Sequence, residues 1–252
     1  MKIFFILLLT LLILGGIYII NKDSNFPTLG KYLFGLTRGT YSKLSPSSIE
    51  DYLEDENVFV VDTRNNTISS LGYLPNSVLL PLNLEYSRWF PALIKEGSNV
   101  VLICDETNYK DSIKQTEKLR SYNILGYAIY DEIIKTKLFD INIPLYNENT
   151  KREVQKLFDK NEYLLDIREV SEFKETGVIE QAHLLPLSEL KDKYQEIPEY
   201  PLNMYIFCKG GGRSLIAMSF LHRAGHKNSI YIMRGGITKT ISEKVQLVPY
   251  TE

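Results

Sequence analysis

Short, uninterrupted runs of apolar residues recur along the chain and predict its buried strands. They are Val58–Val61, Val78–Leu80, Val100–Ile103, Tyr163–Leu165, Leu184–Leu185, Met204–Phe207 and Ile230–Met233. Continuous runs, unlike alternating ones, are typical of strands that are covered on both faces. Helical stretches such as Ser112–Tyr122 and Ser214–Ala224 separate the later strands, and Ser47 with Glu50 fits a capping box at a helix start. This alternation predicts an α/β fold of mainly parallel sheets with helices on both faces.

The same pattern occurs twice. FVVDTR, which contains Asp62, matches YLLDIR, which contains Asp166, at an offset of 104 positions, and Cys104 and Cys208 are separated by the same 104 positions. A third pair, GYLPNSVLLPL and GVIEQAHLLPL, is shifted by 105 positions. Matching order and spacing indicate a duplicated domain. We predict one domain over residues 42–143 and a second over residues 144–252.

An apolar segment from Ile3 to Ile20 contains Thr10 as its only strongly polar side chain. Its length corresponds to about 27 Å of helix, close to the ~30 Å of a membrane's hydrocarbon core. A cleaved signal peptide is the alternative, but its apolar part is usually shorter and ends at small residues. We therefore expect a transmembrane anchor over residues 1–20, a linker over residues 21–41, and a single-pass protein of the cell membrane that contacts the lipid bilayer. The flanking charges leave the side of the membrane open.

Composition and charge exclude other classes. The hydrophobic fraction of 44% provides ample material for a core, and the formal net charge of −2 argues against binding nucleic acid. Only two cysteines occur, which does not fit a scaffold held together by disulfides. Each thiol must therefore be judged from its own surroundings.

Cys208 lies between a predicted strand and a predicted helix, in the segment CKGGGRS. The three glycines Gly210, Gly211 and Gly212 allow backbone amides to turn inward and form an anion-binding nest. The start of the helix at Ser214 adds unpaired amides, and Lys209 and Arg213 add positive charge. Such a setting favours the thiolate form of Cys208, so we expect a reactive nucleophile. The alternative is a small buried cysteine at a strand end.

The second repeat resembles the rhodanese (sulfurtransferase) superfamily in LLDIREVSEF, GVIEQAHLLPL, CKGGGRS and IMRGGI. The resemblance covers residues 42–252 and implies that Cys208, with Arg213, takes a sulfane sulfur from an anionic donor such as thiosulfate. The resulting persulfide would pass its sulfur to cyanide or a thiol. Lys209, Gly210, Gly211, Gly212 and Ser214 would bind the sulfur and its donor, and no metal or organic cofactor is implied. Val178, Glu180 and Thr238–Ile241 depart from the pattern of many relatives, which leaves the acceptor open.

Two other functions remain open. Cysteine-dependent phosphatases and arsenate reductases use the same kind of thiolate, but phosphatases resemble C-x5-R, whereas four residues separate Cys208 from Arg213. A non-catalytic binding module would need no chemistry at Cys208. In the first repeat, Cys104 is followed by DETNYKDS, whose carboxylates disfavour a thiolate. We expect that site to be inactive and allow that it binds a protein partner.

Several other polar or aromatic side chains could carry chemistry but are given a structural role. Asp166 and Arg168 follow a buried strand, so we expect a structural ion pair rather than catalytic groups. His222 and His226 have the spacing of metal ligands, but Gly225 between them predicts a helix end and a solvated pair. Trp89 is expected to pack in the core or between domains.

Overall fold

The computed structural model describes residues 41–65, 72–83, 85–136, 142, 144–147, 151–160, 162–198, 203–242 and 245–251. No helix within these ranges is both long and apolar enough to cross a membrane. The predicted anchor lies outside the described residues, as does nearly all of the predicted linker. Residues 38–252 group into one compact unit. The predicted division after residue 143 therefore stays a prediction.

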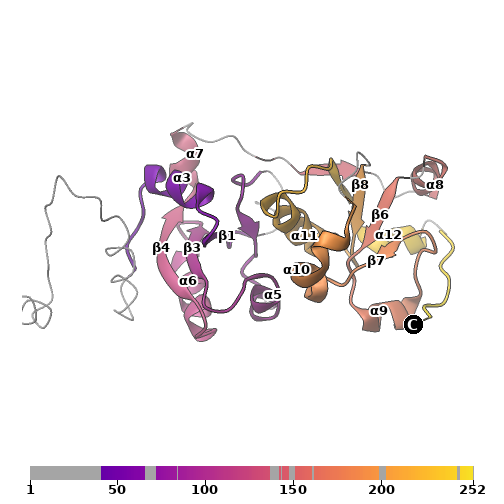
Figure 1. The fold of residues 1–252 in the computed structure, drawn as a ribbon, viewed down its shortest axis with the longest axis horizontal. Coiled ribbons are helices and arrows are strands. Elements are labelled where there is room, and N and C mark those ends of the chain that lie inside the picture. The colour runs from indigo at the N-terminus through magenta and orange to yellow at the C-terminus, as the bar shows by residue number, and fades with distance from the viewer. Residues whose placement is uncertain are drawn as a thin grey trace, which may run out of the picture. The chain divides into compact units, whose positions relative to one another are not determined.

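Two parallel sheets organise the described chain (Figure 1). The first has the strand order β2-β1-β3-β4, with β1 Val58–Asp62, β2 Val78–Leu79, β3 Asn99–Cys104 and β4 Asn123–Ile129. The second has the order β5-β9-β8-β6-β7, with β5 Leu145–Asn147, β6 Tyr163–Asp166, β7 His183–Leu184, β8 Met204–Phe207 and β9 Ile230–Met233. Every pair of neighbouring strands is parallel. The predicted α/β class with parallel sheets is confirmed.

The two sheets share one strand order. Read from the opposite edge, β7-β6-β8-β9 repeats β2-β1-β3-β4, and β5 extends the second sheet by one strand. We call the part of the chain that carries β1–β4 the first half and the part that carries β5–β9 the second half. The sequence repeat therefore corresponds to a repeat of topology.

Helices connect the strands in both halves. The first half contains α3 Pro46–Glu54, α5 Tyr86–Leu93, α6 Tyr109–Lys118 and α7 Tyr130–Lys135. The second half contains α8 Lys151–Asp159, α9 Val170–Thr176, η2 Leu187–Glu189, α10 Leu190–Lys193, η3 Tyr194–Glu196, α11 Gly212–Arg223 and α12 Gly236–Ser242.

The first of these helices begins earlier than predicted. Pro46 occupies its first turn, and Ser45 rather than Ser47 is the N-cap, since Ser45 Oγ accepts a hydrogen bond from the Ser48 amide at 3.3 Å. Proline suits this first helical position because its nitrogen needs no hydrogen-bond partner there. The predicted capping box was therefore wrong by two residues.

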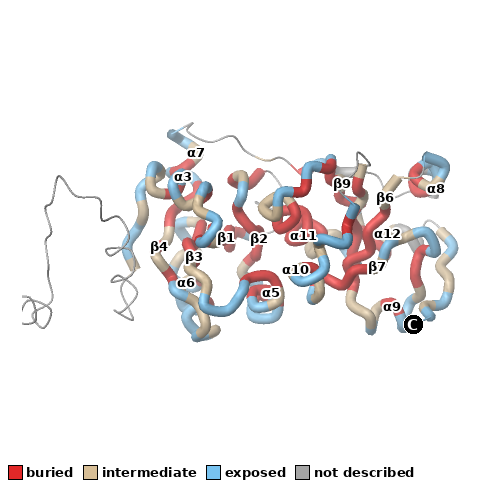
Figure 2. Tube along the Cα trace, in the orientation of Figure 1, coloured by how far each residue is buried: buried red, intermediate tan, exposed pale blue. Residues whose placement is uncertain are grey.

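Helix α11 joins the two halves. It packs against β2, and Figure 2 shows it buried along most of its length. The hydroxyl of Ser219 accepts a hydrogen bond from the Leu79 amide at 2.8 Å, and Tyr73 Oη lies 2.6 Å from Nδ1 of His222. One continuous cluster of buried apolar side chains contains residues of both halves, among them Trp89 and Leu221. The helix that follows Cys208 is thus fixed by the first half.

Candidate functional site

Strand β8 delivers Cys208 to the start of α11. The thiol is buried, with 1% of the residue exposed, and its Sγ accepts a hydrogen bond from the Gly211 amide at 3.0 Å. Gly211 is the N-cap of α11 and has φ +103°, a conformation that side-chain-bearing residues rarely adopt. The sulfur therefore lies against the positive end of a helix and receives a backbone N–H, as the sequence predicted.

The segment with Gly235 and Gly236, at the start of α12, contacts the Cys208 loop. Ile237 and Thr238, in the first turn of α12, donate their amides to the carbonyls of Cys208 at 2.8 Å and Lys209 at 3.2 Å. A Cβ at Gly236, which has φ +55°, would collide with the Cys208 carbonyl. Because α12 binds the carbonyls of Cys208 and Lys209, it holds the loop in the conformation in which the Gly211 amide reaches the sulfur. The sequence analysis used the segment IMRGGI only as part of the family resemblance, and its contacts with the Cys208 loop were not predicted.

Arg213 does not present a free guanidinium. Its Nη1 and Nη2 donate to the two carboxylate oxygens of Glu172 at 2.6 and 2.8 Å, and the two side chains are 13% and 19% exposed. Partial burial would raise the pKa of Glu172, but hydrogen bonds from Arg213 and from the Glu169 amide outweigh burial and hold that pKa below its ordinary value. The predicted role of Arg213 in binding the donor stays a prediction, since its fork is occupied.

Arg88 of the first half contacts the helix that carries Glu172. Arg88, on α5, lies with Nη2 3.3 Å from Oε2 of Glu169, which also accepts a hydrogen bond from the Ser188 hydroxyl at 2.8 Å. Glu169 is the N-cap of α9, the helix that carries Glu172. Neither contact was found from the sequence, because each joins residues far apart along the chain.

Asp166 and Arg168 form a buried ion pair with an Nη2 to Oδ2 distance of 2.6 Å. Nη2 of Arg168 also donates to the Gly177 carbonyl at 3.0 Å. Asp62 and Arg64 repeat this arrangement in the first half, also at 2.6 Å. The pair ties the end of a strand to the following turn in both halves, so the predicted ion pair is present, and its purely structural role stays a prediction.

A small cavity of about 180 Å³ lies beside the Cys208 loop. Its lining is Arg168, Glu172, Glu175, Thr176, Lys209, Ile237 and Thr238. Lys209 and Gly210 are exposed, whereas Gly212 and Arg213 are half-buried and Ser214 is fully buried. The residues proposed to bind a sulfur donor are therefore brought together in one loop, with Lys209 at the edge of the cavity.

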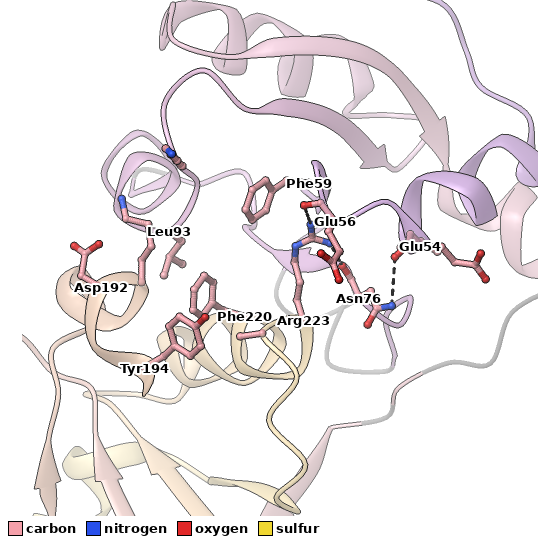
Figure 3. Close-up of a pocket in the computed structure, with 13 residues that line it drawn as sticks. Glu54, Glu56, Phe59, Asn76, Leu93, Asp192, Tyr194, Phe220 and Arg223 are labelled. Atoms are coloured by element: carbon pink, nitrogen blue, oxygen red, sulfur yellow. Dashed lines mark hydrogen bonds between the residues drawn. The ribbon is translucent and has the colours of Figure 1, made fainter. Parts of the chain in front are cut away.

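A larger cavity of about 840 Å³ lies away from Cys208, between the first half and the carboxyl end of α11 (Figure 3). Arg223 donates to the carbonyls of Val58 at 2.8 Å, Asn76 at 3.0 Å and Glu56 at 3.3 Å. Its guanidinium carbon lies 4.4 Å from the centroid of the Phe59 ring. These contacts fix Arg223 as a structural link between the halves.

Cys104 has a different environment. It is fully buried, and burial raises the pKa of its thiol to about 11, while hydrogen bonds from Thr63 and Ser112 act in the opposite direction. Its Sγ accepts from the Thr63 hydroxyl at 3.5 Å rather than from a backbone amide. The expectation that Cys104 disfavours a thiolate is confirmed, but burial is the largest cause and the carboxylates Asp62 and Asp105 contribute less.

The remaining predictions concern histidine and tryptophan. The prediction of a solvated histidine pair was wrong: His226 is 8% exposed, and His222 is half-buried against Tyr73 because α11 packs on the first half. The described residues contain no group of three side chains suited to hold a metal ion. Trp89 is 2% exposed within the shared core, as predicted.

Comparison with known proteins finds similarity to one family over the part of the chain that holds this site. Residues 150–243 match the family model of the rhodanese-like domain. A curated relative from Schizosaccharomyces pombe, named "Putative thiosulfate sulfurtransferase, mitochondrial", is 30% identical over 82 residues, covering 28% of this chain. The match spans 57% of the length of that relative.

Solved structures give further matches. A rhodanese-related protein from Thermoplasma volcanium is 26% identical, with a TM-score of 0.37 and coverage of 42% of this chain and 99% of that one. A thiosulfate sulfurtransferase from Pseudomonas aeruginosa is 18% identical, with a TM-score of 0.36 and coverage of 83% of this chain and 44% of that one. The match to the rhodanese-like domain model covers residues 150–243, and this segment includes Cys208 and its loop.

Proposed function

We propose that the protein is a sulfurtransferase that carries a sulfane sulfur on Cys208. The thiolate attacks the outer sulfur of thiosulfate, a Cys208 persulfide forms, and sulfite leaves with the electron pair of the broken S–S bond. Cyanide or a thiolate then attacks the outer sulfur of the persulfide, and the Cys208 thiolate is released. Thiocyanate or a new persulfide is the product, and the cycle needs no added oxidant or reductant.

The observation that carries this proposal is the hydrogen bond from the Gly211 amide to Cys208 Sγ at the start of α11. A backbone donor and a helix dipole favour negative charge on the sulfur before and after transfer. Lys209, exposed at the edge of the adjacent cavity, can attract an anionic donor. The family match over residues 150–243 supports the same chemistry.

The occupied guanidinium of Arg213 favours sulfur transfer over phosphate chemistry. A phosphatase loop of this kind needs an arginine fork that can bind two phosphate oxygens. Here Glu172 fills that fork through two hydrogen bonds. The short spacing between Cys208 and Arg213 points the same way.

The test is the mass of the protein after treatment with thiosulfate, together with thiocyanate formation from thiosulfate and cyanide. We expect about 32 Da to be added on Cys208, and we expect both signals to be lost in Cys208→Ser. Cys104→Ser is the matched control and should keep both. Turnover of p-nitrophenyl phosphate without a persulfide would support the phosphatase, and the absence of both signals would support a binding module.

We further propose that residues 42–143 and 144–252 are two rhodanese-like domains and that residues 1–20 anchor them to a membrane. The shared strand order and the repeated Asp–Arg pair support the first proposal. The apolar segment from Ile3 to Ile20 supports the second. Extraction of cell membranes with alkaline carbonate tests the anchor: the full chain should stay with the lipid, and a chain that begins at residue 42 should be released.

A further inference from the structure

A connected group of charged side chains extends from the Cys208 loop to α5 of the first half. Arg213 pairs with Glu172, and Oε2 of Glu172 also accepts a hydrogen bond from the Glu169 amide at 3.0 Å. The carboxylate of Glu169 lies 3.3 Å from Nη2 of Arg88. A residue of the first half therefore belongs to the group of charges around the start of α11.

Arg88 is oriented by its neighbours but keeps donors for a further anion. Its guanidinium carbon lies 4.3 Å from the centroid of the Trp89 ring, and Nη1 lies 3.9 Å from Oε1 of Glu85. The Arg88 side chain is nevertheless 55% exposed, whereas that of Arg213 is 13% exposed and its fork is filled. A guanidinium has five N–H donors, so Arg88 can still attract an anion that approaches from solvent.

Electrostatic interactions connect this group to the sulfur. Burial acts to lower the pKa of Arg213, but its hydrogen bonds with Glu172 outweigh burial and raise that pKa. The negative charges of Cys208 and Glu85 contribute in the same direction. Arg213 is therefore within electrostatic range of both the Cys208 sulfur and a carboxylate of α5.

The group contains more carboxylates than Arg213 can offset. Glu85, Glu169 and Glu172 supply three negative charges, and Arg213 balances one of them. The excess disfavours a thiolate and repels an approaching anion. Arg88 balances a second carboxylate, so it reduces this repulsion at the place where α5 meets α9.

We propose that Arg88, supplied by the first half, raises the electrostatic potential at Cys208 and so favours anionic reactants at that sulfur. The first half, whose own cysteine stays protonated, thereby takes part in the chemistry of the second half. The preference for anions among simple alkylating reagents follows from the charges alone. The same preference for thiosulfate as the sulfur donor rests on the proposed function.

The test compares the alkylation of Cys208 by iodoacetate, which is negatively charged, with alkylation by neutral iodoacetamide. Both rates are measured by peptide mass spectrometry on the full chain at low ionic strength, without any sulfur donor. Because both reagents react with the same thiolate, a change in its ionisation or general accessibility cancels in the ratio of the two rates. In Arg88→Ala the ratio of the iodoacetate rate to the iodoacetamide rate should fall about threefold, the effect of removing one nearby charge.

Two further conditions separate charge from structure. Arg88→Lys keeps the positive charge and should keep the ratio of the wild type. In 1 M salt the difference between Arg88→Ala and the wild type should vanish, because the Debye length falls to about 3 Å. A threefold fall that persists in 1 M salt, or an equal fall in Arg88→Lys, would overturn the proposal.

Two variants of the same segment serve as controls. Glu85→Gln removes a negative charge and should raise the ratio, and it leaves the fold intact because the Glu85 side chain makes no capping hydrogen bond to α5. Lys95→Ala removes an exposed cation beyond the other end of α5, on the larger cavity, and should leave the ratio unchanged. An unchanged ratio in Arg88→Ala, or a fall of the same size in Lys95→Ala, would contradict the role of Arg88.

Persulfide formation on the wild type separates this inference from the proposed function. If thiosulfate adds sulfur to Cys208 but the alkylation ratio of Arg88→Ala equals that of the wild type, the function stands and the role of Arg88 fails. If no persulfide forms but the ratio falls, Arg88 acts on Cys208 and the sulfurtransferase fails. If both hold, Arg88→Ala should raise the KM for thiosulfate and leave kcat nearly unchanged, because the lost charge acts on the approach of the anion.

Discussion

The carboxylate of Glu172 fills the guanidinium fork of Arg213 with two hydrogen bonds of 2.6 and 2.8 Å. The pair joins the first turn of α9 to the first turn of α11, next to the loop that holds Cys208. An arginine that the sequence suggests for substrate binding is thus held by a partner 41 residues away. The pair fixes the start of the helix that faces the sulfur.

Glu172→Gln should destabilise the fold by about 1–3 kcal/mol at neutral pH, because it leaves a half-buried guanidinium without its charged partner. The pKa of Glu172 is held below its ordinary value, so the wild-type advantage is present above that ordinary value and is lost as the pH falls through the lower pKa of the folded state. Urea unfolding of both proteins at pH 7 and in acid checks this. A difference that stays constant between the two conditions would show that the ion pair is not its source.

The two cysteines should differ strongly in reactivity. Both thiols are buried, but burial raises the pKa of Cys104 to about 11, so it is almost wholly protonated at pH 8, whereas Cys208 Sγ accepts a hydrogen bond from the Gly211 amide. We expect iodoacetamide to modify Cys208 at least about 100-fold faster than Cys104 at this pH. Peptide mass spectrometry over a time course measures both rates in one sample, and equal rates would contradict the assignment of Cys208 as the reactive site.

Gly236→Ala should impair the Cys208 loop. The added methyl group would meet the Cys208 carbonyl, and φ of +55° is itself unfavourable for alanine by about 1–2 kcal/mol. Persulfide formation on Cys208 should fall further in this variant than in a variant that has only the backbone strain. Gly97→Ala is the control: Gly97 has φ +80°, but nothing lies within 4 Å of an added Cβ, so this variant should lose stability and keep the chemistry.

Arg223→Ala should weaken the packing between the two halves and so destabilise the protein. Its guanidinium donates to three backbone carbonyls of the first half and packs over the Phe59 ring, so we expect a loss of about 2–4 kcal/mol in the free energy of unfolding. Arg223→Lys keeps the charge but lacks the planar fork and should recover only part of the loss. Chemical denaturation followed by circular dichroism measures all three proteins. If Arg223→Lys restored the full free energy of unfolding, the charge of Arg223 rather than the planar geometry of its guanidinium would be its contribution.

The sequence predicted what depends on neighbouring residues. Parallel strands follow from apolar runs such as Met204–Phe207, and the Cys208 loop follows from consecutive glycines before a helix. Strand β4 was missed because Gly126 interrupts its apolar run, at a point where Leu44 and the Ser42 carbonyl approach so closely that no side chain fits.

Other features depend on the folded chain. The partners Glu172 and Arg88 could not be found, because their contacts join segments that only the tertiary structure brings together. His222 was predicted to be solvated because a single helix does not reveal what packs on it. The spacing of Glu169 and Glu172, which fits a helix N-terminus, was the local signal that could have drawn attention to α9.

The hydrogen bond from the Leu79 amide to Ser219 has a practical consequence for anyone who divides this protein. Strand β2 is at the edge of its sheet, and α11 from the other half covers it. Residues 42–143 produced alone would present an open strand edge to which other chains can add, and residues 144–252 alone would expose the apolar face of α11 to water. Both fragments should aggregate, so sulfur chemistry should be assayed on a polypeptide that retains the two sheets together.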